Sequence, residues 1–290
     1  MQVMNEAVFR FLNRKPAKWT FSGGIILNGL IAMFHASGKE EYRRYALDFM
    51  EKSVSPEGVI LPTPACTAAL AACGKGLFFA LDETGETRYK MALDAVADRI
   101  KAEALPDTPA ELYAVMPFLT EYDTRFGGKQ AYKAIVHQFR AVHKTLFDAE
   151  KGLYFGKDGR FSILDEGFIL MALADTAENL DMQIYEHYRT LSDMLFDAVR
   201  LPYRLETDHL FSLSCGDPEQ APDPSGGFMI VYVMLKGVRL QMLDAEKYSF
   251  LAYRLASDLM ACRKDVPEAC DPGVGLLAQA EINVKEVQQP

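Results

Sequence analysis

The chain has 290 residues, of which 49% are hydrophobic and 24% charged, and its formal net charge is −9. This composition predicts a soluble globular protein with a sizeable core, and it excludes a disordered chain or a mini-protein. The acidic balance argues against nucleic acid and membrane surfaces as partners, because both attract basic proteins.

No transmembrane or secretory segment is expected. The first thirty residues lack the cationic start, apolar run and cleavage site of a secretory signal. The most apolar stretch, 228–235, is far shorter than the roughly 18 residues that span a bilayer. The cysteines are odd in number and form no CxxC pair; they are Cys66, Cys73, Cys215, Cys262 and Cys270. They indicate reduced thiols and a cytoplasmic protein.

In chain order, the same pattern recurs five times: an apolar segment, a break rich in Gly or acidic residues, and a charged amphipathic segment. The predicted helical hairpins pair 24–36 with a helix from about 39, 67–81 with 87–100, 111–122 with 130–146, 165–180 with 183–199, and 225–242 with 245–260. A tyrosine marks the same point in four of them, at Tyr42, Tyr89, Tyr132 and Tyr248.

Further helices are expected around 5–12 and, weakly, around 274–282, and only short pieces such as 152–155 look strand-like. Eleven or twelve helices, with the first of each pair poorer in charge, predict an all-α (α/α)6 toroid of inner and outer helices. An open helical solenoid is the alternative, but it needs polar capping repeats. We expect one domain over 1–290, with a partly disordered C-terminal tail over 263–290.

In a toroid of this kind, the loops that enter the inner helices meet at one end of the ring. These loops are 19–23, 61–66, 105–110, 158–164 and 206–224. Helix N-termini favour anionic groups, so a pocket there suits a carboxylated or hydroxyl-rich ligand, a description that sugar acids fit. Acidic residues in such a pocket would serve acid/base chemistry.

Two groups of carboxylates in these loops are candidates, and each has a structural alternative. Asp107 and Glu111 flank Thr108-Pro109, which has the form of a capping box that would occupy Glu111. Ser162 and Asp165 have the same capping-box spacing, which would occupy Asp165 and leave Glu166 as the carboxylate without a capping role.

Nucleotide, serine-hydrolase and metal sites are not expected. The chain has no GxGxxG, GxxxxGK[ST] or GxSxG motif. His209 lies beside Asp208 in the long loop, and with Cys215 it could form a zinc set, but no ligand spacing supports this. We therefore predict no metal and no cofactor.

Several segments together resemble a known family. They are Trp19 with 24–30, 74–78, 84–89, 113–119, 152–155 and 223–239. The order and the residues of these segments resemble those of the unsaturated glucuronyl and rhamnogalacturonyl hydrolases, glycoside hydrolase families 88 and 105, over nearly the whole chain. The resemblance implies an (α/α)6 barrel without metal or cofactor. It also implies hydration of the C4=C5 double bond of a terminal unsaturated uronic acid, with an Asp as the acid.

The sequence departs from that family where the chemistry lies. The resemblance places the family's acid at Ala110 and a second Asp at Ala69, and the "RGNGW" segment reads as 164–168 without its Arg, Leu164 standing in that place. One interpretation is a hydrolase with a relocated acid among Asp107, Glu111, Asp165 and Glu166. Its substrate-binding residues are Trp19, Tyr113, Phe168 and His209.

The second interpretation is a catalytically degenerate relative that binds a carbohydrate or a protein partner. A third, another enzyme on the same toroid such as a sugar epimerase or a terpenoid cyclase, lacks the His pair or DDxxD run expected for it. The expected partner is a short oligosaccharide from pectin or a glycosaminoglycan, and the expected state is a monomer or homodimer.

Overall fold

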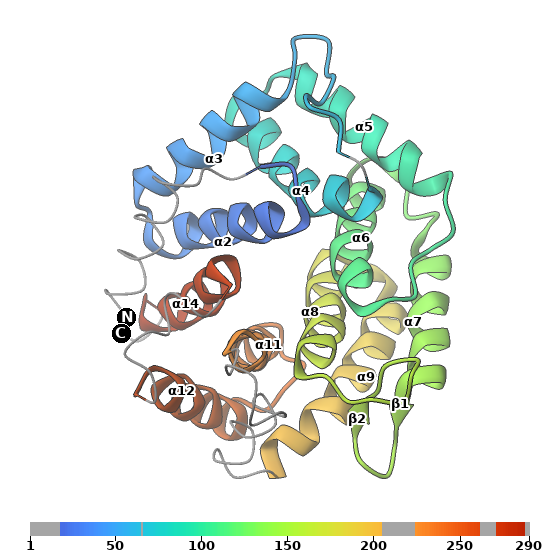
Figure 1. The fold of residues 1–290 in the computed structure, drawn as a ribbon, viewed down its shortest axis with the longest axis vertical. Coiled ribbons are helices and arrows are strands. Elements are labelled where there is room, and N and C mark those ends of the chain that lie inside the picture. The colour runs from blue at the N-terminus through green and yellow to red at the C-terminus, as the bar shows by residue number, and fades with distance from the viewer. Residues whose placement is uncertain (1–17, 65, 205–223, 262–270, 288–290) are drawn as a thin grey trace. The chain divides into compact units, whose positions relative to one another are not determined.

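The structure, a computed structural model, describes residues 18–64, 66–204, 224–261 and 271–287 (Figure 1). Over these ranges the chain is almost wholly helical. The contacts within the chain, which the sequence suggests is one domain, group it into two compact units. Unit 1 combines Met1–Leu105 with Asp271–Pro290, and unit 2 is Pro106–Cys270.

The described residues of unit 1 form two helical hairpins and one C-terminal helix. Its helices are α2 (Phe21–Ser37), α3 (Glu40–Ser53), α4 (Thr67–Thr84), α5 (Thr87–Lys101) and α14 (Pro272–Val287). In Figure 1, α2 lies between α3 and α14, and it also packs against α4. Both predicted hairpins of this unit are therefore confirmed.

The close packing of α2 on α4 depends on a glycine. A Cβ atom added at Gly24 would lie 2.5 Å from the carbonyl carbon of Ala72, so only glycine lets the two backbones approach this far. Asn28 in the next turn donates a hydrogen bond of 3.2 Å from Nδ2 to the Ala72 carbonyl. Helix α2 then ends at Gly38, whose φ of 66° is the left-handed value expected after a helix C-terminus.

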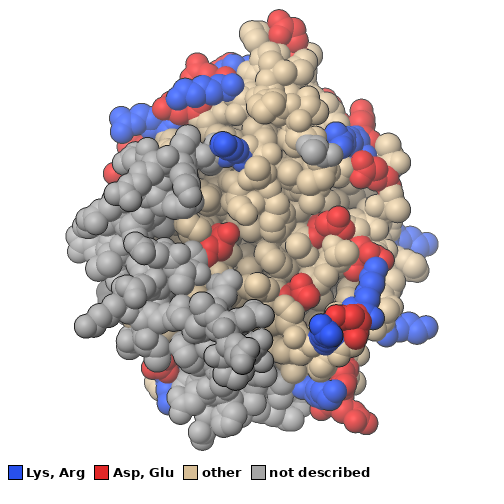
Figure 2. All heavy atoms as spheres, in the orientation of Figure 1, with Lys and Arg blue, Asp and Glu red and all other residues tan. Residues whose placement is uncertain are grey.

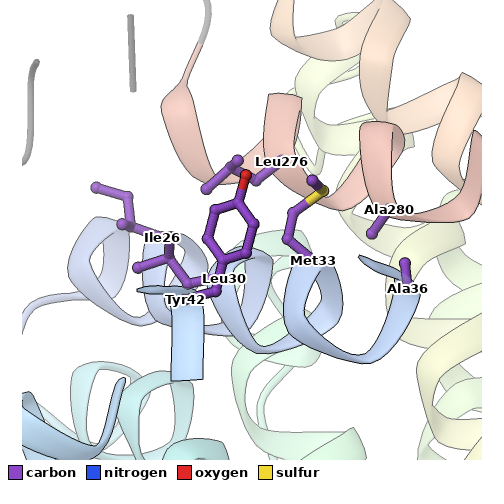
Figure 3. Packing of buried hydrophobic residues seen from close by; sticks show 7 residues of the cluster. All are labelled: Ile26, Leu30, Met33, Ala36, Tyr42, Leu276 and Ala280. Carbon is purple, nitrogen blue, oxygen red and sulfur yellow. The ribbon is translucent and has the colours of Figure 1, made fainter. Parts of the chain in front are cut away.

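The core beside α2 is closed by the C-terminal helix (Figure 3). The buried side chains of this cluster are Ile26, Leu30, Met33, Ala36, Tyr42, Leu276 and Ala280. Helix α14 lies within the segment 263–290 that the sequence suggests is partly disordered, and its packing on α2 accounts for the helix over 272–287. The apolar residues of α14 are needed to cover α2, and the helix is longer than the 274–282 predicted.

The described residues of unit 2 form the other three predicted hairpins. Its helices are α6 (Pro109–Tyr122), the π-helix η1 (Asp123–Gly127), α7 (Tyr132–Leu146), α8 (Ile163–Asn179), the 3-10 helix η2 (Met182–Ile184), α9 (Tyr185–Arg204), α11 (Ser225–Arg239) and α12 (Ala245–Ala261). Helix α8 packs against α6, α9 and α11, and α11 packs against α12. The strand-like segment 152–155 is confirmed as part of a small hairpin, in which β1 (Phe147–Asp148) pairs with β2 (Leu153–Tyr154) in antiparallel register.

The contact between α8 and α11 combines close backbones with a buried ion pair. A Cβ at Gly167 would lie 2.5 Å from Met229 Sδ, so this glycine lets α11 approach the first turns of α8. Farther along, Lys236 is 4% exposed and its Nζ lies 2.7 Å from Asp175 Oδ1, which also accepts a hydrogen bond of 2.7 Å from the Tyr232 hydroxyl. The buried charge is thus compensated.

The four marker tyrosines are buried at 0–3% exposure, so each is a core residue. The helix predicted around 5–12 lies outside the described residues. No helix in the described part of the chain is both long and apolar enough to cross a bilayer.

Candidate functional site

The first turn of α8 presents the carboxylate whose surroundings best suit an acid. Asp165 is half-buried, and its backbone N–H donates a hydrogen bond of 3.3 Å to the Ser162 side chain, as the capping pattern predicts. Partial burial raises the pKa of Asp165, and the negative charge of Asp158 raises it further. Asp165 therefore keeps a proton to higher pH than an ordinary Asp while remaining partly open to solvent.

The neighbouring Glu166 has no exposed surface. Its Oε2 accepts a hydrogen bond of 2.7 Å from the backbone N–H of Tyr154, and Oε1 has no hydrogen-bond partner among the described residues. Burial raises the pKa of Glu166 to about 8, although the hydrogen bond from Tyr154 opposes the shift. This side chain is a neutral acid at pH 7 that joins the β hairpin to α8.

A histidine completes the support of that hairpin. His143 Nδ1 lies 2.7 Å from the Tyr154 hydroxyl, and its ring stacks on Phe147 with centroids 4.4 Å apart. Burial lowers the pKa of His143, so its ring is neutral at pH 7. These contacts give His143 a packing role.

The carboxylates at the start of α6 have surface environments. Glu111 is exposed and accepts a hydrogen bond of 2.6 Å from Thr108 Oγ1. Helix α6 begins at Pro109 as predicted, but Thr108 makes no side-chain bond to the backbone, so the two capping-box side chains bond each other instead. Asp107 is exposed and pairs with Lys157 at 2.5 Å. Neither position has the burial that would adapt a carboxyl group to proton donation.

Two of the predicted binding residues meet between α6 and α8. The rings of Tyr113 and Phe168 lie 5.7 Å apart at 35°. Tyr113 is 1% exposed, which leaves no ring face for a sugar, whereas Phe168 is half-buried. Because Phe168 lies three residues after Asp165, both are on the same side of α8.

On the face shown in Figure 2, acidic side chains over α6 and α8 stand apart from one another among uncharged residues.

Trp19 belongs to a separate pocket in unit 1. The indole is 7% exposed and stacks on Phe49 of α3, with ring centroids 6.1 Å apart at 25°. A pocket of about 700 Å³ opens beside this pair, and Leu61 and Pro62 also line it. The structure therefore brings together two of the predicted loops, 19–23 and 61–66. The contribution of Phe49 was not foreseen, because it lies on an ordinary amphipathic helix with no motif around it.

The remaining predicted positions divide into two groups. His209, with Asp208 and Cys215, lies outside the described residues. Ala69 and Ala110, where the resemblance expects acids, lie within α4 and α6 and bring no chemistry of their own. In the part of the chain that the structure describes, no group of three or more His, Cys, Asp or Glu residues could hold a metal ion. Of the described cysteines, Cys66 and Cys73 are free thiols.

Comparison with known proteins gives one family. The model of Glycosyl Hydrolase Family 88 matches residues 1–260. A comparison with curated protein sequences gives no match.

Among solved structures, a family 105 glycoside hydrolase from C. acetobutylicum ATCC 824 superimposes with a TM-score of 0.77 at 19% identity, covering 97% of this chain and 99% of that one. A family 88 glycosyl hydrolase from Bacteroides vulgatus has a TM-score of 0.77 at 16% identity, covering 97% and 98%. An unsaturated glucuronyl hydrolase specific for heparin has a TM-score of 0.61 at 13% identity, covering 93% and 86%. The likeness to these structures confirms the all-α (α/α)6 fold expected from the hairpin pattern.

Proposed function

This chain belongs to glycosyl hydrolase family 88, and on that premise we propose that it removes a terminal unsaturated uronic acid from short pectin- or glycosaminoglycan-derived oligosaccharides. One solved structure of the same fold is described as an unsaturated glucuronyl hydrolase specific for heparin, which supports this substrate class.

We assign the acid to Asp165. The observation that carries this assignment is the combination of partial burial, a raised pKa and an open position in the first turn of α8. The neutral carboxyl group donates its proton to C4 of the C4=C5 double bond, and positive charge develops at C5 beside the ring oxygen. Water adds at C5 and returns a proton to the Asp165 carboxylate. The resulting hemiketal then opens and releases the next sugar.

The other predicted residues have supporting roles in this proposal. Phe168 borders the site next to Asp165. Glu166 accepts a hydrogen bond from the Tyr154 N–H, which holds the first turn of α8 against the β hairpin. Trp19 binds a sugar in the pocket of unit 1. His209 stays a predicted binding residue. The cytoplasmic location and the monomeric or dimeric state also remain predictions.

The test is the loss of the ultraviolet absorbance of the conjugated acid, followed over a panel of unsaturated uronyl disaccharides. We expect turnover by the wild type and a decrease of about 10²–10⁴-fold in kcat for Asp165→Asn, the range for loss of a general acid. A similar loss in Glu111→Gln, with Asp165→Asn still active, would instead place the acid at Glu111.

A specific observation favours a second candidate, a relative that binds sugar without chemistry. Alanines stand at both positions where the resemblance expects acids, Ala69 and Ala110. Binding of the unsaturated disaccharides, detected by thermal shift, with no turnover of any of them would support this candidate and exclude the hydrolase.

A further inference from the structure

The pocket in unit 1 has a chemistry that the reaction at Asp165 does not use. Its volume of about 700 Å³ lies within the range of roughly 300–1,000 Å³ that is typical of small-molecule sites. Its walls combine aromatic rings from Trp19 and Phe49 with two basic side chains, Lys18 and Lys52.

The aromatic wall is fixed by its own backbone. The N–H of Thr20 donates a hydrogen bond of 2.7 Å to the Lys18 carbonyl, and the Thr20 hydroxyl accepts one of 3.0 Å from the N–H of Gly23. A Cβ at Gly23 would lie 1.9 Å from the Lys18 oxygen, so glycine is required for this turn to lie across the start of α2. Trp19 is thereby held against Phe49 without help from a ligand, and a preformed wall loses little entropy on binding.

The charged side chains around the pocket form no ion pairs within the described residues. Lys18 and Lys52 are exposed, and neither has a carboxylate partner among the described residues. By contrast, Arg43 on the same helix as Lys52 pairs with Glu40 at 2.6 Å. Asp48 also lines the pocket and has no cationic partner within the described ranges. In the described part of a protein with a net charge of −9, two lysines without a carboxylate partner thus lie beside an aromatic wall.

We propose that this pocket binds an acidic sugar unit, with the sugar carboxylate between Lys18 and Lys52, hydroxyl groups donating to Asp48, and the pyranose ring against Phe49. The substrate class rests on the proposed function, whereas the site and its residues are argued from the pocket alone. Charge-assisted hydrogen bonds to lysine would select an acidic sugar over a neutral one.

The chain provides its own probe, because Trp19 is its single tryptophan. Intrinsic tryptophan fluorescence of the full chain therefore reports on this pocket. The titrant is trigalacturonate, a saturated oligosaccharide that has no C4=C5 double bond to hydrate. Maltotriose is the neutral control, and sodium sulfate at equal ionic strength is the control for a simple anion.

We expect a saturable fluorescence change with trigalacturonate and none with maltotriose or sulfate. Lys52→Gln should raise the Kd about tenfold, as expected for the loss of one charge-assisted contact. Lys39→Gln is the matched control, because Lys39 is an exposed lysine at the opposite end of α3 and does not line the pocket.

Three results would overturn the proposal: no response to trigalacturonate, an equal response to maltotriose, or an equal response to sulfate, which would indicate a simple anion site. An unchanged Kd in Lys52→Gln would show that Lys52 does not contact the sugar carboxylate, contrary to the proposal. Binding and turnover are read separately here. A protein that binds trigalacturonate but hydrolyses no unsaturated sugar would contradict the proposed function and leave this site standing.

Discussion

The carboxyl group of Glu166 and the backbone N–H of Tyr154 are joined by a hydrogen bond of 2.7 Å that is wholly buried. The bond connects the first turn of α8 to the β hairpin that precedes it. It also fixes an ionisable group where water cannot solvate its charge, which has a measurable effect on stability.

The first prediction concerns that effect. The pKa of Glu166 is about 8 in the folded protein and is near 4.3 in an unfolded chain. Between these values the folded state binds more protons, so the contribution of Glu166 to stability is complete at low pH and is lost as pH rises through 8. Glu166→Gln stays neutral and keeps an oxygen for the Tyr154 N–H. Compared with wild type, it should gain roughly 2 kcal/mol or more between pH 5 and 8.5.

Urea unfolding at pH 5 and pH 8.5 measures this difference. Glu150→Gln is the control, since Glu150 is an exposed acid in the same hairpin. Parallel pH profiles for wild type and Glu166→Gln would contradict the buried neutral acid.

The second prediction concerns Asp158. After burial, its charge is the second cause of the raised pKa of Asp165. Asp158→Asn removes the charge but keeps the oxygen that accepts a 3.0 Å hydrogen bond from the Arg160 N–H. The pKa of Asp165 should fall, and the alkaline limb of kcat/KM should therefore move to lower pH.

The full pH profile of kcat/KM is the measurement. Asp193→Asn removes the same charge from the exposed surface of α9 and should leave the limb in place. A limb that does not move in Asp158→Asn would argue that the titrating acid is another group.

These residues show how far the sequence predicts the site. Both Glu111 and Glu166 look like acids of a first helical turn, and the Ser162 pattern correctly predicts the cap of α8. One carboxylate is nevertheless exposed and the other fully buried. The difference arises from the hairpin at Tyr154, whose packing on α8 is a tertiary contact that no periodicity encodes.

The helices themselves are predicted well, because strong local signals coincide at their ends. Gly38 and Gly85 end α2 and α4 with left-handed φ values, as their positions after apolar segments predict. The pocket around Phe49 and Lys52 could not be predicted in the same way. On an amphipathic helix these two residues are indistinguishable from ordinary surface positions until the loop at Leu61 lies beside them.

The third prediction concerns the buried Lys236. Its replacement by Met leaves the Asp175 carboxylate buried without the ammonium group that lies 2.7 Å away. We expect Lys236→Met to reduce the free energy of unfolding by about 3–5 kcal/mol at pH 7. Urea unfolding tests this, with Lys247→Met at an exposed position of α12 as the control. A loss below about 1 kcal/mol would mean that the pair is not isolated from water.

The fourth prediction concerns the contact of α2 with α4. Gly24→Ala should destabilise the protein by about 1–3 kcal/mol, since the added methyl group meets the Ala72 backbone, which cannot rotate away. Gly38→Ala is the comparison, because no atom lies within 4 Å of its added methyl group and only its φ of 66° is strained. Thermal unfolding of both variants should rank Gly24→Ala as the more damaging. The reverse order would show that α2 and α4 can move apart at low cost.

The packing of α14 on α2 has a consequence for synthesis on the ribosome. The whole of unit 2 lies between these two helices in the sequence, so α2 is synthesised long before α14. Leu30 and Met33 stay uncovered by α14 until residues 272–287 have been made. Unit 2 is contiguous and can complete its own contacts first. We therefore expect nascent chains that end before 272 to carry a folded second unit, while α2 exposes the apolar side that α14 covers, the kind of surface that chaperones recognise.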